Sequence, residues 1–205
     1  MRRVIVLVLT ATLQACSGDG DDGIGTATVA ETVAGTTTGT VTVAEPELRR
    51  ELLAMMEEDQ AEQTGEVATN NYSARTDRLA EILDEHGWPG LDLVGEDGST
   101  AAWVIAQHAD LDPDLQQRAL ELLRAAAEEG QASKGDMAYL EDRVAVAAGD
   151  DQQYGTQIRC ADDGTPVPAT PIADDSSVDE RRAEAGLPPL ADYIDERTTV
   201  CAGAG

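Results

Sequence analysis

The chain has 205 residues, of which 40 are Asp or Glu and 14 are Lys or Arg, so its formal net charge is -26. A chain this acidic repels the phosphates of nucleic acids and anionic lipid headgroups, which makes nucleic acid a poor partner. A solvated acidic surface explains the charge, and binding of a cation or a cationic peptide is the alternative. Since Phe is absent, the core must consist mainly of Leu, Ala, Val and Met.

The first residues have the order of a bacterial secretory signal that ends in a lipidated cysteine. Two arginines precede an apolar run from Val4 to Leu13, which is too short to span a bilayer. The letters LQAC, which end at Cys16, resemble a lipobox. We therefore expect a signal peptide at 1–15 and acyl chains such as palmitate on Cys16, which would hold the protein to the extracytoplasmic face of the cell membrane. An ordinary signal peptide with a chance cysteine is the alternative.

A composition shift separates a linker from the folded part. Residues 16–44 are dominated by Gly, Thr, Ala and Val, and they contain too few large side chains to build a core. We expect a flexible tether there, which lifts the domain off the membrane. The folded domain should occupy residues 45–197 as one unit, and residues 198–205 should form a flexible tail.

Helical patterns fill most of this domain. Apolar residues recur at helical spacing in its first half. Asp112 and Ser133 are suitable N-caps, because each is followed by helix-forming residues and by an acid in the first turn. The expected helices cover residues 45–63, 71–87, 99–108, 112–130 and 133–148.

The periodicity changes after residue 150. β-forming residues, a Gly turn and several prolines predict a short β-hairpin or extended segment near 154–172. Two further helices are expected over 177–186 and 187–197. The predicted fold class is therefore mostly α, a single compact helical domain of about six or seven helices with a short hairpin.

Polar residues lie in register with the apolar faces of these helices. Polar side chains in such positions need partners, because burying them unpaired costs free energy. One explanation is that helix ends gather around a polar pocket that binds a small ligand. The polar positions reached by continuing each apolar stripe are Asp59, Gln60, Arg75, His86, Gln107, His108 and Arg143.

The chain has two histidines, and each ends a helical pattern just before a break. A structural role explains each one alone, because His is favoured at the negative end of a helix by about 0.3–1 kcal/mol. The functional alternative places His86 and His108 in one pocket. There they would act with Asp59 in proton transfer as catalytic residues, or bind a metal ion with Asp110. Their separation of 22 residues (108 minus 86) matches no compact metal-binding motif.

The segment QYGTQ at 153–157 offers hydroxyl and amide groups without charge. Tyr154 and Gln157 are therefore suited to hydrogen bonds with a neutral polar ligand such as a sugar or a peptide amide. A helix C-cap followed by the start of a strand is the alternative. No motif in the sequence identifies a cofactor.

Two cysteines remain once Cys16 is lipidated, Cys160 and Cys201. An even number of cysteines in an oxidising compartment suggests one disulfide. The small residues around Cys201 favour a flexible tail, which argues against the required geometry. Both states therefore stay open at this point.

Several rare words occur in one order along the chain: EDQ at 58–60, HGWPG at 86–90, LVGEDG at 93–98, AAWVIAQHAD at 101–110, YLEDRV at 139–144, QYGTQ at 153–157 and DERRAEAGLPPLADY at 179–193. Together they resemble a bacterial family called domain of unknown function 6624, over about residues 45–195. The family has no established activity, so the resemblance implies the extent of the domain and a common pocket for its polar words. That pocket would contain Asp59, Gln60, Arg75, His86, Gln107, His108, Arg143, Tyr154 and Gln157.

Three functions are consistent with these patterns. The leading hypothesis is a lipid-anchored envelope protein that binds a small polar or peptide-like ligand. The first alternative is a hydrolase, in which His108 or His86 is the general base or a metal ligand and Asp59 orients it. The second alternative is a structural component of an envelope protein complex.

Overall fold

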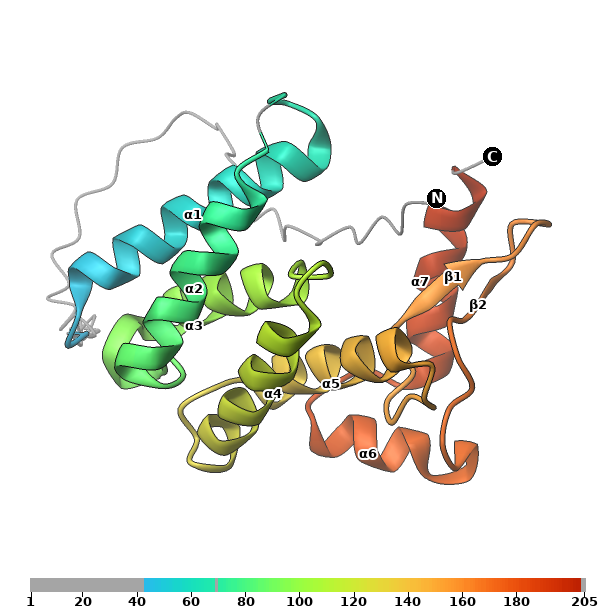
Figure 1. The fold of residues 1–205 in the computed structure, drawn as a ribbon. Helices are drawn as coiled ribbons and strands as arrows, with labels where there is room; N and C mark the ends of the chain where they lie inside the picture. The colour runs from blue at the N-terminus through green and yellow to red at the C-terminus, as the bar shows by residue number, and fades with distance from the viewer. Residues whose placement is uncertain (1–42, 69, 204–205) are drawn as a thin grey trace, which may run out of the picture. The chain divides into compact units, whose positions relative to one another are not determined.

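A computed structural model describes residues 43–68 and 70–203 of the chain. Within these residues the fold has seven α-helices, one 3₁₀ turn and a two-stranded antiparallel sheet (Figure 1). A mostly α domain with a short hairpin confirms the predicted fold class. None of the described helices is both long and apolar enough to cross a membrane. The expected signal peptide, Cys16 and the tether up to residue 42 lie outside the described residues.

The elements follow one another with short connections. The helices are α1 Pro46–Thr64, α2 Tyr72–His86, α3 Leu91–Gln107, α4 Pro113–Glu128, α5 Lys134–Ala148, α6 Val178–Glu184 and α7 Leu190–Ala202. The strands β1 Ile158–Cys160 and β2 Pro166–Pro168 pair antiparallel, with Arg159 opposite Val167. A 3₁₀ turn at Asp175–Ser177 precedes α6.

The hydrophobic core lies among α1 to α5, and α3 contacts each of the other four helices. Its central side chains include Leu52, Leu79 and Ile82, none of which is exposed to solvent. Each such side chain contributes about 1.5–3 kcal/mol through its burial. Trp88 also packs in the core, and its Nε1 donates a hydrogen bond to Ser99 Oγ at 3.0 Å. Aliphatic packing around Trp88 and the partly buried Trp103 therefore compensates for the lack of phenylalanine.

Both predicted helix N-caps are present in the structure, but α3 starts earlier than predicted. Asp112 accepts a hydrogen bond from Leu115 N, and Ser133 accepts one from Asp136 N, so both predicted caps are confirmed. We predicted a third helix from residue 99, whereas α3 begins at Leu91 and bends at Gly95, where φ is 77°. The two glycines in this segment hide the helical pattern, because the chain changes direction between two short helical pieces.

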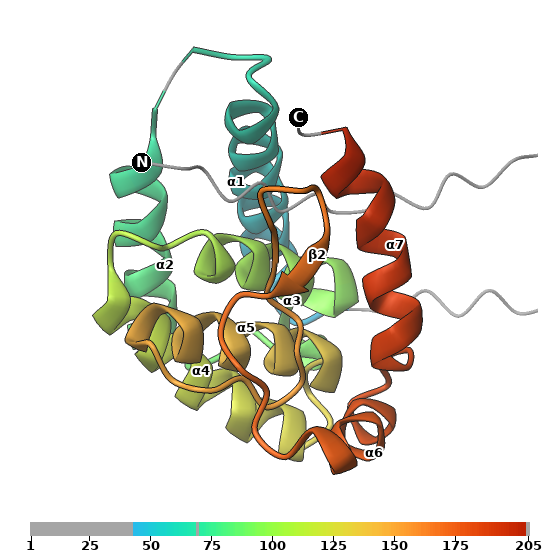
Figure 2. The same cartoon turned by 90° about the vertical axis from the view of Figure 1, so that its right-hand side faces the viewer.

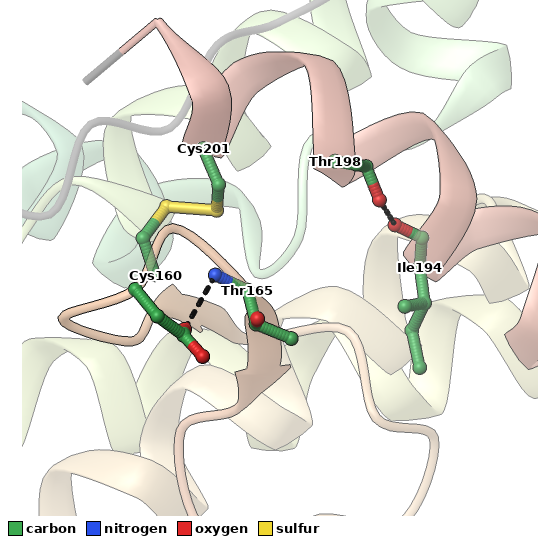
Figure 3. The surroundings of a disulfide bond; sticks show 6 residues. Cys160, Thr165, Ile194, Thr198 and Cys201 are labelled. Atoms are coloured by element: carbon green, nitrogen blue, oxygen red, sulfur yellow. Dashed lines mark hydrogen bonds between the residues drawn. A yellow bond between two sulfur atoms is a disulfide. The ribbon is translucent and has the colours of Figure 1, made fainter. Parts of the chain in front are cut away.

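The C-terminal part also differs from the prediction. We expected a flexible tail from residue 198, but α7 continues to Ala202 and runs alongside the hairpin (Figures 1 and 2). Cys201 is buried and forms a disulfide with Cys160 of β1 (Figure 3). This covalent link fixes the last turns of α7, and local sequence patterns cannot report a contact across 41 residues.

Candidate functional site

The first polar group, which we call the His108 cluster, consists of Asp59, Glu62, Arg75 and His108. Asp59 continues the buried stripe of α1 and is only 3% exposed. His108 is the C-cap residue of α3, and its Nδ1 lies 2.5 Å from Asp59 Oδ2. The structure thus brings together a carboxylate and an imidazole that are 49 residues apart in the sequence.

Arg75 of α2 occupies the other side of Asp59. Its Nη2 donates to Glu62 Oε2 at 2.6 Å and lies 3.5 Å from Asp59 Oδ1. Burial alone would lower the pKa of Arg75, but the hydrogen bond to Glu62 and the charge of Asp59 outweigh it and raise this pKa. Gln60 Nε2 contacts Asp59 Oδ2 at 3.3 Å. Both oxygens of Asp59 are therefore held in place, which restrains the imidazole beside it.

The second ring nitrogen of His108 is open. Next to an arginine, the Asp59 carboxylate acts as an acceptor, so Nδ1 is the donor of this hydrogen bond, and in the neutral imidazole Nε2 is the acceptor nitrogen. Nε2 has no hydrogen-bond partner within residues 43–68 and 70–203, yet it is not one of their fully buried unpaired atoms. It therefore keeps a small exposed area, although the side chain as a whole is only 8% exposed. An imidazole held at Nδ1 and open at Nε2 can accept a proton from a bound molecule.

A second polar group, the Arg143 cluster, consists of Asp110, Gln116, Arg143 and Gln157. Arg143 holds Asp110 with two hydrogen bonds, Nε to Oδ1 at 2.9 Å and Nη2 to Oδ2 at 2.6 Å. Its Nη1 also contacts Gln157 Oε1 at 3.4 Å, and Gln116 Nε2 contacts Asp110 Oδ1 at 3.3 Å. This bidentate pair connects the turn after α3 to α5 and to the segment that carries Gln157.

Gln107 joins the two groups. It directly precedes His108 and is 1% exposed. Its Nε2 lies 3.5 Å from Tyr139 O, whereas its Oε1 is buried and has no donor among the described residues. A buried amide oxygen without a donor is costly, because it has lost its hydrogen bonds to water. Gln107 Oε1 is therefore an unmet hydrogen-bond acceptor in the interior.

Asp142, which the sequence analysis did not select, organises the segment after α5. Its carboxylate is fully buried and accepts four hydrogen bonds, from the backbone N of Gln153, Tyr154 and Thr156 and from Thr156 Oγ1, at 2.7–3.1 Å. The main chain of Tyr154 is thereby fixed, and burial raises the pKa of its phenol. The only sequence signal for Asp142 was an acid beside the buried stripe of α5, and its acceptor role depends on a turn that local patterns do not define.

His86 lies away from both groups. It ends α2, eleven residues after Arg75, which corresponds to about 16 Å along a helix axis. Its side chain is 31% exposed, and Nε2 lies 3.7 Å from Glu85 Oε2. It lines a separate pocket of about 570 Å³ together with Trp88 and Gln131. The expected single pocket with two histidines is therefore not what the described residues form.

The three candidate metal ligands also occupy different surroundings. His108 Nδ1 faces Asp59, Asp110 is held by Arg143, and His86 lies at the far end of α2. In the part of the chain that the structure describes, no group of three or more His, Cys, Asp or Glu side chains could hold a metal ion. The other residues selected from the sequence fall into two sets. Those in the two groups or beside them are Asp59, Gln60, Arg75, Gln107, His108, Arg143 and Gln157. The main chain of Tyr154 instead contacts Asp142 and Arg182.

Comparison with known proteins identifies a family for this domain. Residues 46–200 match the model of the family of unknown function DUF6624. No curated protein and no solved structure matches the chain. The matched span begins with α1, ends within α7, and contains the His108 cluster, the Arg143 cluster and Asp142. Because this span is about three quarters of the 205 residues, the chain belongs to the family of unknown function DUF6624.

Proposed function

We propose that the domain is a hydrolase in which His108 is the general base and Asp59 orients it. The observation that carries this proposal is the 2.5 Å contact between His108 Nδ1 and Asp59 Oδ2, with Nε2 open to solvent. A carboxylate at one ring nitrogen selects the tautomer in which the other nitrogen accepts a proton. Buried His–Asp pairs also serve as structural links, but such a link does not require an open Nε2.

The proposed reaction needs one proton shuttle. Nε2 of His108 would remove a proton from a water molecule as that water attacks an electrophilic carbon of the substrate. The same proton would then pass from Nε2 to the leaving group, which restores the neutral imidazole. Asp59 would stabilise the positive ring between these steps, and Arg75 would keep Asp59 in position. Proton transfer of this kind contributes about 10²- to 10⁴-fold to a rate.

The groups beside His108 indicate a small polar or peptide-like substrate. Gln107 Oε1, buried and unpaired within the described ranges, would accept a hydrogen bond from an amide N–H or a hydroxyl. The Arg143 side chain is 11% exposed and already holds Asp110, so it offers little free charge. Hydrogen bonds rather than ion pairs would therefore select the substrate at this position.

A binding protein without turnover is the second candidate function. The buried amide oxygen of Gln107 favours it, because this atom gains a donor from any bound amide or hydroxyl. In a binding protein, affinity should fall in similar steps when Gln107, His108 or Gln157 is replaced. In a hydrolase, replacement of His108 alone should remove turnover while substrate affinity changes little.

We also propose that the protein acts at the cell envelope, held by lipid on Cys16. The sequence MRRVIVLVLTATLQAC supports this location. A Cys16→Ser variant should leave the membrane fraction and should no longer incorporate labelled palmitate. Equal membrane retention of both proteins would argue for an ordinary signal peptide. This outcome would leave the proposed chemistry of the domain unaffected.

The test of the hydrolase is a turnover screen of the full-length chain. Chromogenic esters, peptide anilides, glycosides and phosphodiesters cover the main classes of hydrolysed bond. We expect turnover of at least one substrate, a loss of about 100-fold or more in His108→Gln, and a comparable loss in Asp59→Asn. His86→Gln is the matched control, since it replaces the only other histidine. Turnover that persists in His108→Gln would contradict the proposal, and a panel without any turnover would favour the binding protein.

A further inference from the structure

The arginines of the domain fall into two groups. Every arginine from residue 49 to residue 143 forms an ion pair with a carboxylate. The arginines after residue 150 form no carboxylate ion pair within the described parts of the chain, and they are Arg159, Arg181, Arg182 and Arg197. The segment after residue 150 also contains eleven Asp and Glu residues, so it is not positively charged as a whole, and these four arginines differ from the others in lacking a paired carboxylate. A guanidinium without a paired carboxylate keeps donors that an external anion could bind.

Arg182 is the most costly of these charges, because its side chain is fully buried. Its Nε donates to Pro188 O at 2.6 Å and its Nη1 to Tyr154 O at 2.7 Å. Its Nη2 is buried and finds no acceptor in the residues that the structure describes. Burial lowers the pKa of Arg182, because the charged form loses hydration. Asp179 and Asp142 oppose this shift through space, but neither forms an ion pair with Arg182, so a further negative charge nearby would be stabilising.

Arg197 provides a second charge on the same aromatic ring. The Cζ atoms of Arg182 and Arg197 lie 5.0 and 4.8 Å from the centroid of the Tyr193 ring. A ring of this kind attracts one cation, but two guanidinium groups around it repel each other. Arg197 Nε is buried and lacks an acceptor among residues 43–68 and 70–203, whereas its terminal nitrogens are not among the buried unpaired atoms. These terminal nitrogens therefore face solvent and can receive a ligand.

The geometry of α7 holds this arginine in place. Tyr193, Arg197 and Cys201 are spaced four residues apart, so they lie along one face of the helix. That face is fixed by the disulfide between Cys201 and Cys160 (Figure 3). The hydrogen bond from Tyr193 Oη to Thr156 O at 2.9 Å also fixes it. The fixed helix face therefore holds the backbone of Arg197 in place. Its side chain is half-buried and contacts the Tyr193 ring.

We propose that Arg197, with Arg182 behind Tyr193, forms a binding site for the carboxylate or phosphate group of a small ligand. The solvent-facing edge of Arg197 would bind two oxygens of the anion at once, as guanidinium groups do. Arg182 would add attraction at longer range, since its own edge is buried. None of these residues belongs to the His108 cluster, so the site stands independently of the proposed hydrolase.

The experiment is an anion titration of the full-length chain. Calorimetry measures the Kd, and the shift in melting temperature provides a second readout. Sodium phosphate and sodium acetate represent the two groups, and sodium chloride at equal ionic strength and pH is the reference. We expect saturable binding of phosphate, acetate or both, which chloride does not reproduce. The arm with the lower Kd identifies whether the natural ligand carries a phosphate or a carboxylate.

Variants locate the site. Arg197→Gln should raise the Kd at least about tenfold, because it removes the two-donor edge. Arg159→Gln is the matched control, since it removes another arginine without an ion pair in the described residues, and it should leave the Kd unchanged. The ¹⁵N–¹H signal of Arg197 Nε should also shift saturably in the unmodified protein. Equal effects of all three salts, an unchanged Kd in Arg197→Gln or a static Nε signal would overturn the proposal.

Discussion

His108 Nδ1 lies 2.5 Å from Asp59 Oδ2, and this contact joins the C-terminal end of α3 to the fourth turn of α1. Both side chains are more than nine-tenths buried, with exposed fractions of 8% and 4%. Arg75 and Glu62 complete a chain of charges behind them. Interactions between charged groups are stronger in such a shielded place than at the surface. The pair is therefore suited to hold one tautomer of the imidazole.

The buried carboxylate of Asp142 should be a major determinant of stability. Asp142→Ala removes the acceptor of four hydrogen bonds and leaves their donors buried, so unfolding should become easier by about 3–5 kcal/mol. Urea denaturation monitored by circular dichroism measures this change. Glu141→Ala is the control, since it removes the neighbouring acid, which pairs with Arg124 in a partly exposed position, and it should cost less than about 1 kcal/mol. Similar effects of the two changes would refute the role of Asp142.

Two glycines with positive φ should differ in their response to alanine. At Gly155, φ is 66° and a Cβ would lie 2.5 Å from Ile172 Cδ1, so the substitution combines backbone strain with overpacking. We expect Gly155→Ala to destabilise the fold by about 3 kcal/mol. At Gly149, φ is 81° but nothing lies within 4 Å of such a Cβ, so strain alone should cost about 1–2 kcal/mol. Melting curves that rank the two variants in the opposite order would contradict this explanation.

Asp136 should make stability depend on pH. Burial raises the pKa of its carboxyl from 3.8 to about 6, against the opposing hydrogen bond from Ser133. Between these values the folded protein binds more protons than the unfolded chain, so stability should fall as the pH rises from about 4 to 6. Asp136→Asn should remove this slope and raise the unfolding free energy at pH 7 by about 2 kcal/mol, a figure that allows for partial exposure. Asp114→Asn, at an exposed position in the first turn of α4, should retain the slope. An unaltered pH profile in Asp136→Asn would rule out this residue as its cause.

The disulfide should stabilise the C-terminal part. It closes a loop across 41 residues, for which the chain-entropy relation gives about 4 kcal/mol. Reduction by dithiothreitol should therefore lower the melting temperature, and Cys201→Ser should lower it to a similar extent. Dithiothreitol should not lower the melting temperature of the Cys201→Ser variant any further. Cys16→Ser provides the control, because it removes the third cysteine and should leave the melting temperature unchanged. A melting temperature that is insensitive to dithiothreitol would contradict this contribution.

Local signals in the sequence predicted much of this fold. The N-caps at Asp112 and Ser133 are determined by side chains within three residues, so the starts of α4 and α5 could be read directly. The early start of α3 could not, because Gly95 bends it and interrupts the periodicity. The length of α7 depends on Cys160, which is distant in the sequence.

The candidate site was predictable as a set of residues but not as an arrangement. Polar positions on apolar stripes pointed to Asp59 and His108, yet periodicity within one helix gives no information about which helix end faces another. The same reasoning placed His86 with them, although His86 ends α2 and Arg75, which contacts Asp59, lies near the start of that helix. The role of Asp142 depends on four donors from a turn, which exists only once the fold has formed.

Modification of the two histidines by diethyl pyrocarbonate tests whether Asp59 prepares His108 to accept a proton, because this reagent acylates unprotonated imidazole nitrogens. Mass spectrometry of peptides resolves His86 and His108 in the same sample of the full-length chain. We expect His108 to react at Nε2 and Asp59→Asn to slow this reaction at least about tenfold, since the amide no longer fixes the tautomer. His86 should react at one rate in both proteins, which controls for folding. An unreactive His108, or equal His108 rates in the two proteins, would contradict an imidazole that Asp59 prepares for proton transfer.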